Sequence, residues 1–405
     1  MTRSHVSTRP LAKATLILLA LMCGISIGSA YYAQPLLPAI GRAFHVSDAA
    51  IGLVPMLTQI GIGAGVLIFM PLGDIVDNRK LILLLVGAHV VTLALVASSR
   101  TANMLYWSST LMGLTTIAPY LLPPFAAKLS PPESRGHVTG FLARGFFAGI
   151  LLARTVSGYA GYYLAWNAVY WIALAAMLIV AVLFASHVPA SRPTLRLGYG
   201  QLLRSLVTVF LQEPKLRLAA LTQGLLFGAF NAFWTSLAFY LETPQFHLPS
   251  YVAGLFGVVG LAGALGAPLF GKLADRRGPE FAVKLGTSIA LLSWVIFAFL
   301  GGSLAGLIVG VLLLDLGITA SHVSNQTIIY RLAPEIRSRV TTLYILGLFT
   351  GGAGLSRLAT LVWAAHGWHG VCTLGLAVTV IAAVVNFVPG KRPVTDATAK
   401  RVWME

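Results

Sequence analysis

Asp315 is the acidic residue whose place in the sequence most suggests chemistry. It lies deep inside an apolar segment, whereas Asp48 and Glu242 lie near the ends of such segments and the other acids lie in loops or tails. A carboxylate inside a membrane-length apolar segment is costly unless it is paired, protonated or exposed to water. Asp315 is therefore interpreted either as a group that takes up and releases a coupling proton, or as a permanent hydrogen-bond partner of the backbone or of polar groups near Asn325.

Two arginines inside apolar segments occur in the same Gly-x4-Arg pattern. Four residues separate Gly149 from Arg154, and four separate Gly352 from Arg357. An arginine keeps its charge, so it must pair, reach the interface or line water. Each of the two can attract an anionic solute or fix helix packing near the outer end of its segment, and their matched positions favour packing. Arg144 is interpreted as reaching the lipid headgroups.

The remaining chemistry-bearing residues predict neither a metal nor a cofactor. His89 and His322 have no second ligand at metal-binding spacing. Cys23 and Cys372 lie in apolar segments and are interpreted as small core residues. The chain also lacks the Gly-x4-Gly-Lys-Ser/Thr phosphate loop, which argues against ATP hydrolysis by this chain alone.

Apolar segments of membrane length must position all these residues. Apolar residues make up 57% of the chain and charged residues 10%, against roughly 45–50% and 25% in soluble domains. Because about twenty apolar residues cross a bilayer as one helix, the pattern predicts an all-α membrane protein with twelve transmembrane helices. They are centred near residues 24, 58, 89, 114, 149, 174, 227, 260, 290, 313, 349 and 379. The first also resembles a signal peptide with a cleavage site at Gly28-Ser29-Ala30, but the repeat described below favours a retained helix.

The positive charges are distributed with a strong bias. Of the 28 Lys and Arg residues, 23 lie in the N-terminus, the even-numbered loops and the C-terminus, two (Arg42 and Arg100) lie in odd-numbered loops, and three lie inside segments. This bias places both termini in the cytoplasm. It also explains the net charge of +16 without a nucleic-acid partner, because the basic residues form no continuous patch.

The chain repeats at an offset of about 200 residues. GDIVDNRK at 73–80 matches GKLADRRG at 271–278, and SPPESRG at 130–136 matches APEIRSR at 333–339. Repeated halves of six spans are typical of secondary transporters. The repeat predicts two pseudo-symmetric six-helix bundles at 1–186 and 214–390, joined by a cytoplasmic linker at 187–213 and followed by a cytoplasmic tail at 391–405. Residues 197–211 of the linker are read either as an amphipathic helix on the membrane surface or as a plain linker.

The repeated loops contain a glycine followed by a carboxylate. The residues concerned are Gly73, Asp74, Asp77 and Arg79 in the first copy, and Gly271, Asp275 and Arg276 in the second. Glycine permits a sharp turn and close helix approach, and a carboxylate can cap the positive N-terminus of a neighbouring helix. The loops are therefore interpreted as a conformational latch, with a turn carrying topogenic charge as the alternative.

These loops resemble those of the major facilitator superfamily, and the six-plus-six plan covers nearly the whole chain. Further strings resemble a bacterial branch of drug and metabolite exporters: YYAQPLL at 31–37, GILLARTVSG at 149–158, DLGITASHVSNQ at 315–326 and RSR at 337–339. The resemblance implies that the helix latched by Asp77 is span 11 of the opposite half, and that this contact stabilises the outward-open state. It also implies a cavity lined by spans 1, 4, 7 and 10, the last of which carries Asp315.

Polar and aromatic residues on these spans are the predicted substrate-cavity residues. They are Tyr31, Gln34, Tyr120, Gln223, Asn231, Trp234, Asn325 and Gln326. Aromatic rings with a few polar groups suit an amphipathic organic solute. Tyr31 and Trp234 are equally compatible with the aromatic belt at the membrane interface.

Together these features predict a monomeric secondary active transporter in the inner membrane of a bacterium, whose partners are a small-molecule substrate, the proton and the lipid bilayer. Export of a small amphipathic organic molecule, driven by inward proton movement through alternating access, is the favoured function. The alternatives of the same fold are an importer or an exporter of sugars or organic acids. An enzyme would need a clustered catalytic set and a receptor a signalling domain, and the sequence suggests neither.

Overall fold

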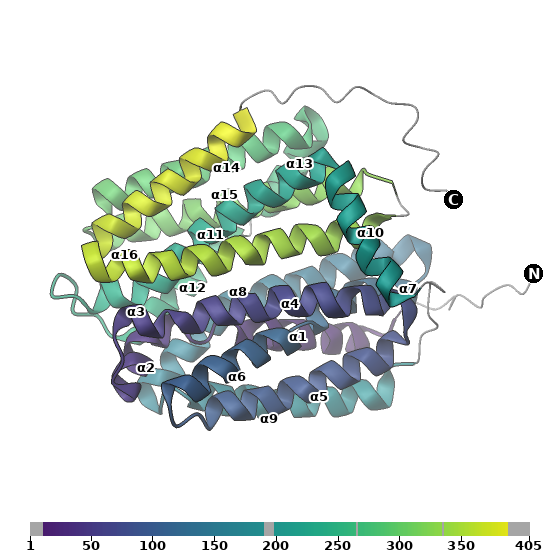
Figure 1. The fold of residues 1–405 in the computed structure, drawn as a ribbon, viewed down its shortest axis with the longest axis horizontal. Helices are drawn as coiled ribbons and strands as arrows, with labels where there is room; N and C mark the ends of the chain where they lie inside the picture. The colour runs from purple at the N-terminus through teal and green to yellow at the C-terminus, as the bar shows by residue number, and fades with distance from the viewer. Residues whose placement is uncertain (1–10, 190–197, 265, 334–335, 388–405) are drawn as a thin grey trace, which may run out of the picture.

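The computed structural model describes residues 11–189, 198–264, 266–333 and 336–387, and every regular element within these ranges is a helix (Figure 1). The N-terminal half comprises α1 (Lys13–Ser29), the short 3-10 helix η1 (Gln34–Leu36), α2 (Leu37–Phe44), α3 (Asp48–Ile51), α4 (Leu53–Ile75), α5 (Asn78–Ala97), α6 (Ala102–Thr115), α7 (Ala118–Lys128), η2 (Pro132–Ser134), α8 (Arg135–Tyr163) and α9 (Ala168–His187). The connecting helix is α10 (Tyr199–Gln212). The C-terminal half comprises α11 (Pro214–Glu242), α12 (Ser250–Ala264), α13 (Ala267–Arg277), α14 (Pro279–Leu300), α15 (Leu304–Tyr330) and α16 (Arg337–Phe387).

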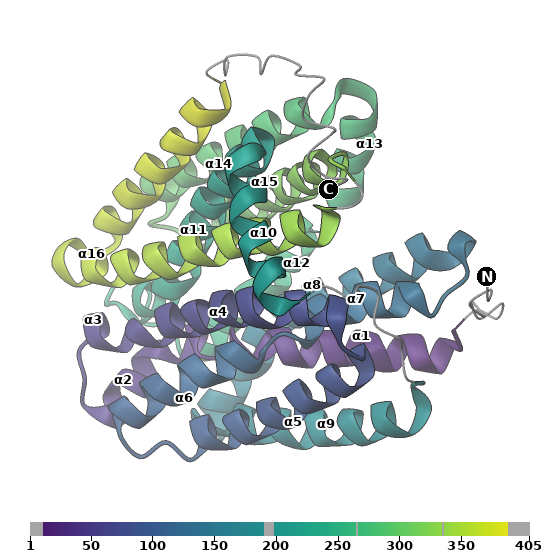
Figure 2. The same cartoon turned by 45° about the vertical axis from the view of Figure 1, so that its right-hand side comes forward.

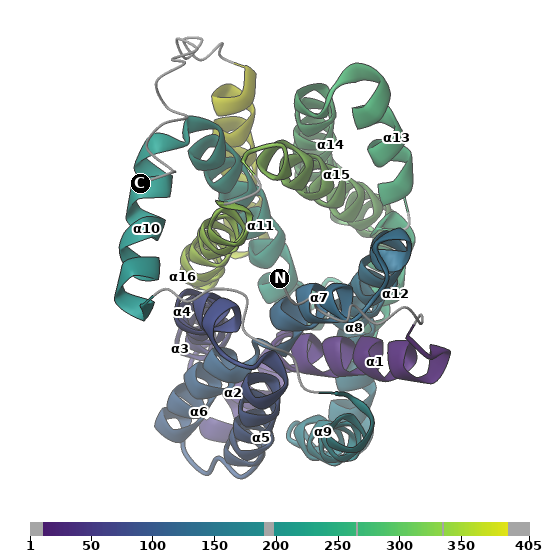
Figure 3. The same ribbon diagram turned by 90° about the vertical axis from the view of Figure 1, so that its right-hand side faces the viewer.

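The axes of the long helices lie roughly along one direction, with the chain running back and forth, so the molecule has two distinct ends (Figure 1). We call one the α3 end, where α2 and α3 lie, and the other the α10 end, where α10 and α13 lie. The helices of each half pack mainly on one another, with α1 against α8 and α4 against α6 in the first half, and α11 against α16 and α14 against α15 in the second. The halves meet where α4 packs on α16 and where α8 packs on α12. Figure 3, seen from the α10 end, shows α10 on the outside of α16 and α4.

Within the described residues, nine helical segments are long and apolar enough to cross a membrane. One of them, α16, is interrupted at Gly367, whose φ of 59° is readily adopted only by glycine. The helices α6 and α7 are shorter, and are separated at Thr116 and Ile117. Pro119, near the start of α7, has no N–H with which to continue the hydrogen-bond ladder of α6. The helices α12 and α13 are likewise short, so the number twelve stays a prediction.

Close glycine contacts make the internal repeat visible in three dimensions. In the first half, α1 crosses α8 where a Cβ on Gly149 would lie 2.4 Å from the Cα of Gly24. In the second half, α11 crosses α16 where a Cβ on Gly351 would lie 2.8 Å from the Cα of Gly224. Such contacts allow helix backbones to approach closely where no hydrophobic force drives association in lipid. The two crossings are separated by about 200 residues, the offset seen in the sequence.

The connecting segment forms α10 over residues 199–212, which agrees with the helical one of its two interpretations. Leu202, Leu206 and Val209 of α10 are buried against the bundle, whereas Val207 and Leu211 are 62% and 64% exposed. The apolar surface therefore continues around the helix, which suits a location at the membrane surface, although that location stays a prediction. Residues 190–197 of the linker and the tail at 391–405 lie outside the described residues.

Candidate functional site

Arg154 of α8 is the centre of a polar group buried between the two halves. Its side chain is fully buried. Its Nε donates to Gln34 Oε1 at 2.9 Å, and its Nη1 donates to the Ile150 carbonyl oxygen at 3.1 Å. Its Nη2 has no hydrogen-bond partner within the described part of the chain. The guanidinium therefore keeps donors unused while its recorded partners are neutral.

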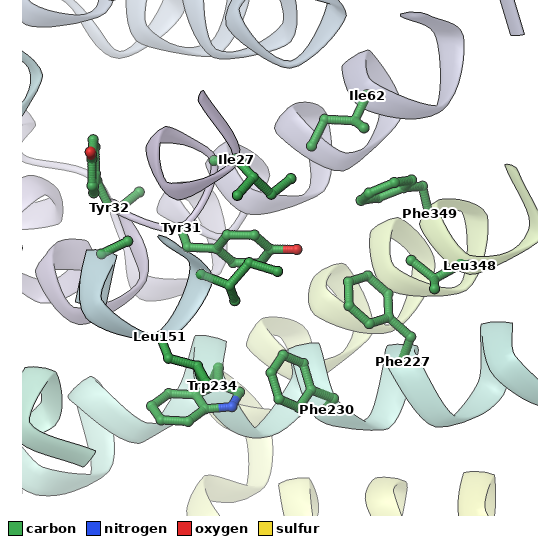
Figure 4. Close-up of a cluster of buried hydrophobic side chains, with 14 of the residues drawn as sticks. Ile27, Tyr31, Tyr32, Ile62, Leu151, Phe227, Phe230, Trp234, Leu348 and Phe349 are labelled. Atoms are coloured by element: carbon green, nitrogen blue, oxygen red, sulfur yellow. The ribbon is translucent and has the colours of Figure 1, made fainter. Parts of the chain in front are cut away.

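Three aromatic rings surround this guanidinium. The Arg154 Cζ lies 4.1 Å from the centroid of the Trp234 ring, 4.9 Å from that of Tyr31 and 5.3 Å from that of Phe230. A cation over an aromatic face is stabilised by about 0.5–2 kcal/mol for each favourable pair, the larger value where water is excluded. Figure 4 shows that Tyr31 approaches from the N-terminal half, whereas Phe230 and Trp234 approach from α11. The rings thus enclose the charge between the two halves, with Tyr31 on one side and two rings of α11 on the other.

Asn231 of α11 connects this group to the N-terminal half through its side-chain amide. Its Oδ1 accepts from Gln34 Nε2 at 3.3 Å and from Gln59 Nε2 at 3.1 Å, and its Nδ2 donates to the Phe227 carbonyl oxygen at 2.9 Å. Gln59 was not among the residues predicted for the cavity. Its signal in the sequence is a polar pair with Thr58 inside the otherwise apolar α4.

Asp315 lies on α15, across α12 from Arg154. Its side chain is 3% exposed, and its Oδ2 has no hydrogen-bond partner among the described residues. A Cβ on Gly260 of α12 would lie 3.0 Å from this oxygen, while one on Gly257 would lie 3.3 Å from the Cβ of Arg154. The glycine face of α12 thus lets the two charges interact electrostatically across the helix. Asn325, the suggested alternative partner of Asp315, donates instead to Ser321 Oγ at 3.2 Å.

Of the other predicted cavity residues, Tyr120 borders the Arg154 group, whereas Gln223, Asn325 and Gln326 have no recorded contact with it among the described residues. The ring of Tyr120 contacts the rings of Phe146 and Phe349, with centroids 5.8 and 6.0 Å away. Gln223 is buried, and both polar atoms of its side-chain amide lack partners among the described residues. Gln326 is half-buried. The structure therefore brings Tyr31, Gln34, Asn231 and Trp234 together with Arg154. It places Tyr120 at the border of that group, through its interaction with Tyr31.

At the α3 end the halves are joined by a second set of polar contacts. Arg42 Nη1 and Glu242 Oε2 form an ion pair at 2.6 Å, and Trp363 Nε1 donates to Asp48 Oδ2 at 3.1 Å. Arg357 donates to the Ala49 carbonyl oxygen. A cavity of about 600 Å³ opens beside these contacts. Arg357 thus lies at one end of the molecule and is half-buried, whereas its repeat partner Arg154 is fully buried between the halves.

The first predicted latch is a helix cap in this structure. Asp77 is the N-cap of α5, and its Oδ1 accepts from the Arg79 backbone N–H at 2.9 Å. Arg79 Nη2 donates to the Ala185 carbonyl oxygen of α9 at 2.5 Å, and Asp74 interacts electrostatically with Lys128. These recorded contacts stay within the N-terminal half. The predicted contact with span 11 stays a prediction.

The second copy of the loop presents its charges outward. A Cβ on Gly73 would lie 2.9 Å from Leu121 Cδ2, whereas one on Gly271 would meet open space. Asp275 and Arg276 are both exposed. In the described ranges no group of three His, Cys, Asp or Glu side chains is placed to hold a metal ion.

A helical membrane protein with a charged and aromatic group buried between two repeated halves has the architecture of a transporter. The family model of the Major Facilitator Superfamily matches residues 19–355. The chain belongs to this superfamily, and it is therefore a membrane transporter of small molecules rather than an enzyme.

Individual relatives agree with this assignment. The chain is 37% identical to the putative uncharacterized transporter YgaY of Escherichia coli over 93% of its own length and 95% of that protein. It is 32% identical to a probable transporter of Streptomyces coelicolor over 90% and 84% of the two lengths. Among solved structures, it resembles a POT family transporter in complex with a thioalcohol-conjugated peptide. That likeness has a TM-score of 0.78 at 12% identity, over 93% of this chain and 95% of the other, and concerns the fold alone.

Proposed function

We propose that this transporter exports a small amphipathic organic molecule in exchange for protons, by alternating access between its two halves. The observation that carries the proposal is Asp315, a carboxylate that is 3% exposed and lies across α12 from the buried Arg154. One of its oxygens has no hydrogen-bond partner in the part of the chain that the structure describes. A carboxylate in such a place can change its protonation state when water or a neighbouring charge reaches it. Asp315 lies in the C-terminal half and Arg154 in the N-terminal half. Movement of the halves therefore changes the distance between the two side chains and the strength of their electrostatic interaction.

The solute site of this proposal is the Arg154 group. Tyr31, Phe230 and Trp234 offer aromatic surface, and Gln34 and Asn231 offer hydrogen-bonding groups at the same interface. Sites for organic molecules commonly combine an apolar lining with a few convergent polar groups. Tyr120, Gln223, Asn325 and Gln326 are assigned to the path between this site and the α10 end.

The proposed orientation follows from the charge bias, which puts both termini and the α10 end in the cytoplasm of a bacterial inner membrane. The α3 end is then periplasmic, and its ion pair and hydrogen bonds close the site on that side. Figure 2 shows α7 and α8 diverging from α13 and α15 towards the α10 end. Because an ion pair and a hydrogen bond join the halves at the α3 end, we propose that this conformation is inward-facing and that the protein acts as a monomer.

In the outward-open conformation, the proposed latch forms at the cytoplasmic end. Asp77 then caps span 11, the first part of α16, and Asp275 plays the same part in the second copy, supported by Gly73, Asp74, Arg79, Gly271 and Arg276. In the present structure Asp77 caps α5. The latch thus consists of a carboxylate with two alternative helix N-termini to cap.

A second candidate function is transport of a neutral sugar, or import rather than export. The observation that favours a sugar is the cluster of three amides formed by Gln34, Gln59 and Asn231. Amide groups offer both donors and acceptors, which match hydroxyl groups. The cluster would contact a sugar while the aromatic rings stack on its apolar face.

The proposal is tested with the purified full-length protein in proteoliposomes that contain a pH-sensitive dye. Growth of cells with and without the protein, on a panel of toxic amphipathic compounds, first selects the solutes. We expect a selected solute to move against its own gradient when protons flow the opposite way, and the dye to report that flow. Solute movement that proceeds only down its own gradient, with no proton flow, would contradict the proposal.

A further inference from the structure

The Arg154 charge is buried without an anion in direct contact. Among the described residues it is the only lysine or arginine side chain that is fully buried. Its recorded hydrogen-bond acceptors are the Gln34 amide and the Ile150 carbonyl, both neutral. A buried charge costs several kcal/mol unless it is paired and hydrogen-bonded. The site therefore contains a strong donor, Arg154 Nη2, that has no partner among the described residues.

The nearest source of negative charge does not use this donor. Asp315 interacts with Arg154 electrostatically, but its Oδ2 also lacks a partner among the described residues. The backbone of α12 lies between the two side chains, as the contacts of Gly257 with Arg154 and of Gly260 with Asp315 show. Two complementary buried groups are thus kept apart, and each has an atom free for a third molecule.

We propose that the transported molecule is an organic monoanion, whose carboxylate pairs with Arg154 and whose apolar or aromatic body lies among Tyr31, Phe230 and Trp234. This inference rests on the proposed function and names the substrate class of the same site. A guanidinium offers two parallel donors to a carboxylate. An amine would be repelled by Arg154, and a neutral solute could accept a hydrogen bond from Nη2 but would leave the buried charge without an anion.

The surrounding rings determine which carboxylates fit. Figure 4 shows Phe227 and Phe349 beyond Phe230, so the aromatic lining continues from the Trp234 side towards α16. The Phe227 and Phe349 ring centroids are 5.7 Å apart. A planar aromatic acid can stack within this lining while its carboxylate stays at the guanidinium. Small inorganic anions satisfy the charge and leave the apolar surface uncovered.

Binding is measured on the full-length protein in detergent, as the shift in the temperature of unfolding and the quenching of tryptophan fluorescence. The probes are three naphthalene derivatives of the same size: 2-naphthoate, 2-naphthylmethylamine and 2-naphthalenemethanol, with benzoate and potassium chloride as further anions. We expect 2-naphthoate to bind, benzoate to bind more weakly, and the amine, the alcohol and chloride to have no effect. Equal protection by chloride, stronger binding of the amine or alcohol, or no binding of either carboxylate would overturn the inference.

The Arg154→Gln variant separates a binding role from a packing role. Because it removes a buried charge that has no anionic partner in contact, we expect a higher unfolding temperature without solute and loss of the 2-naphthoate effect. A lower unfolding temperature with 2-naphthoate binding retained would show that Arg154 serves packing, and would overturn the inference. Arg154→Lys, which keeps the charge and loses the paired donors, is expected to weaken binding about tenfold. The lysine variant also decides the matter if the glutamine variant does not fold, because unchanged binding would contradict the proposal.

Failure of this inference differs from failure of the proposed function. If an amine or a neutral solute is exported in exchange for protons, the substrate class is wrong and proton-coupled export stands. If 2-naphthoate binds through Arg154 but moves without protons in proteoliposomes, the substrate class stands and proton coupling fails.

Discussion

Gly52, at the start of α4, packs directly against Thr360 of α16. A Cβ built on Gly52 would lie 2.1 Å from Thr360 Oγ1 and 2.5 Å from its Cβ, so only glycine fits while the α3 end is closed. This contact lies close in the chain to the bond from Arg357 to the Ala49 carbonyl oxygen. The closed end therefore depends on backbone proximity as well as on its exposed ion pair, since such pairs are worth only about 0–1 kcal/mol.

Gly52→Ala is expected to open the α3 end. Overpacking of a tight contact costs about 1–3 kcal/mol, and this cost falls on the closed conformation alone. Spin labels at Ala43→Cys and Ala365→Cys, one in each half at this end, should report longer distances in the variant. Removing the opposing side chain with Thr360→Gly should restore the distances. Unchanged distances in the Gly52→Ala protein would show that this contact does not control the closure.

Labelling of introduced cysteines tests the orientation of the chain in the membrane. Arg204→Cys and Arg276→Cys should resist a membrane-impermeant maleimide in intact cells, whereas Arg100→Cys should react. All three side chains are exposed, and the native Cys23 and Cys372 are buried. Labelling at position 204 or 276 from outside would refute the assignment made from the charge bias.

Asp77→Asn separates the charge of the proposed latch from its capping role. Asparagine caps a helix about as well as aspartate, whereas alanine costs about 1 kcal/mol. We expect Asp77→Asn to insert and unfold like the original protein but to transport more slowly, because the outward-open state loses a charged contact. Thr101→Ala is the matched control, since Thr101 caps α6 through the Met104 N–H at 3.2 Å. Transport at the original rate across all solute concentrations would rule out the latch.

Gly260→Ala should impair proton coupling through Asp315. The added methyl group would lie 3.0 Å from Asp315 Oδ2 and 3.2 Å from the other carboxyl atoms. It would therefore block the access of water to Oδ2 and slow proton exchange there. Proton-driven transport should fall more than solute binding does. Gly87→Ala is the control, because a Cβ there meets nothing within 4 Å. Equal proton-driven rates in the two variants would argue against this role for the face of α12.

Much of this arrangement follows from patterns in the sequence. The apolar periodicity, the charge bias and the repeat predict a helical transporter, and polarity inside apolar segments identifies Asp315, Arg154, Gln34 and Asn231. These signals are enough to identify the residues because a polar group inside an apolar helix is energetically costly and is usually kept for a function. The family assignment is confirmed by the comparisons.

Tertiary contacts explain what the sequence did not reveal. The repeat suggested equivalent roles for Arg154 and Arg357, but one is enclosed by aromatic rings between the halves and the other bonds to a backbone carbonyl at the α3 end. Gln59 joins the site only because α4 packs beside α11 at Asn231. The position of Tyr120 beside Phe349 and Tyr31 depends likewise on how α7 packs, which spacing along the chain does not encode.

The most direct test of the account is transport by Asp315→Asn in proteoliposomes, measured both as solute counterflow and as uptake or export driven by a pH gradient. Asparagine keeps the shape of the side chain and cannot exchange a proton, so the protein should still fold. We expect counterflow to persist, because the Arg154 group still binds the solute, and gradient-driven transport to fall to the level of empty vesicles. Full gradient-driven transport by Asp315→Asn would contradict the account and leave Asp315 as a structural residue of α15.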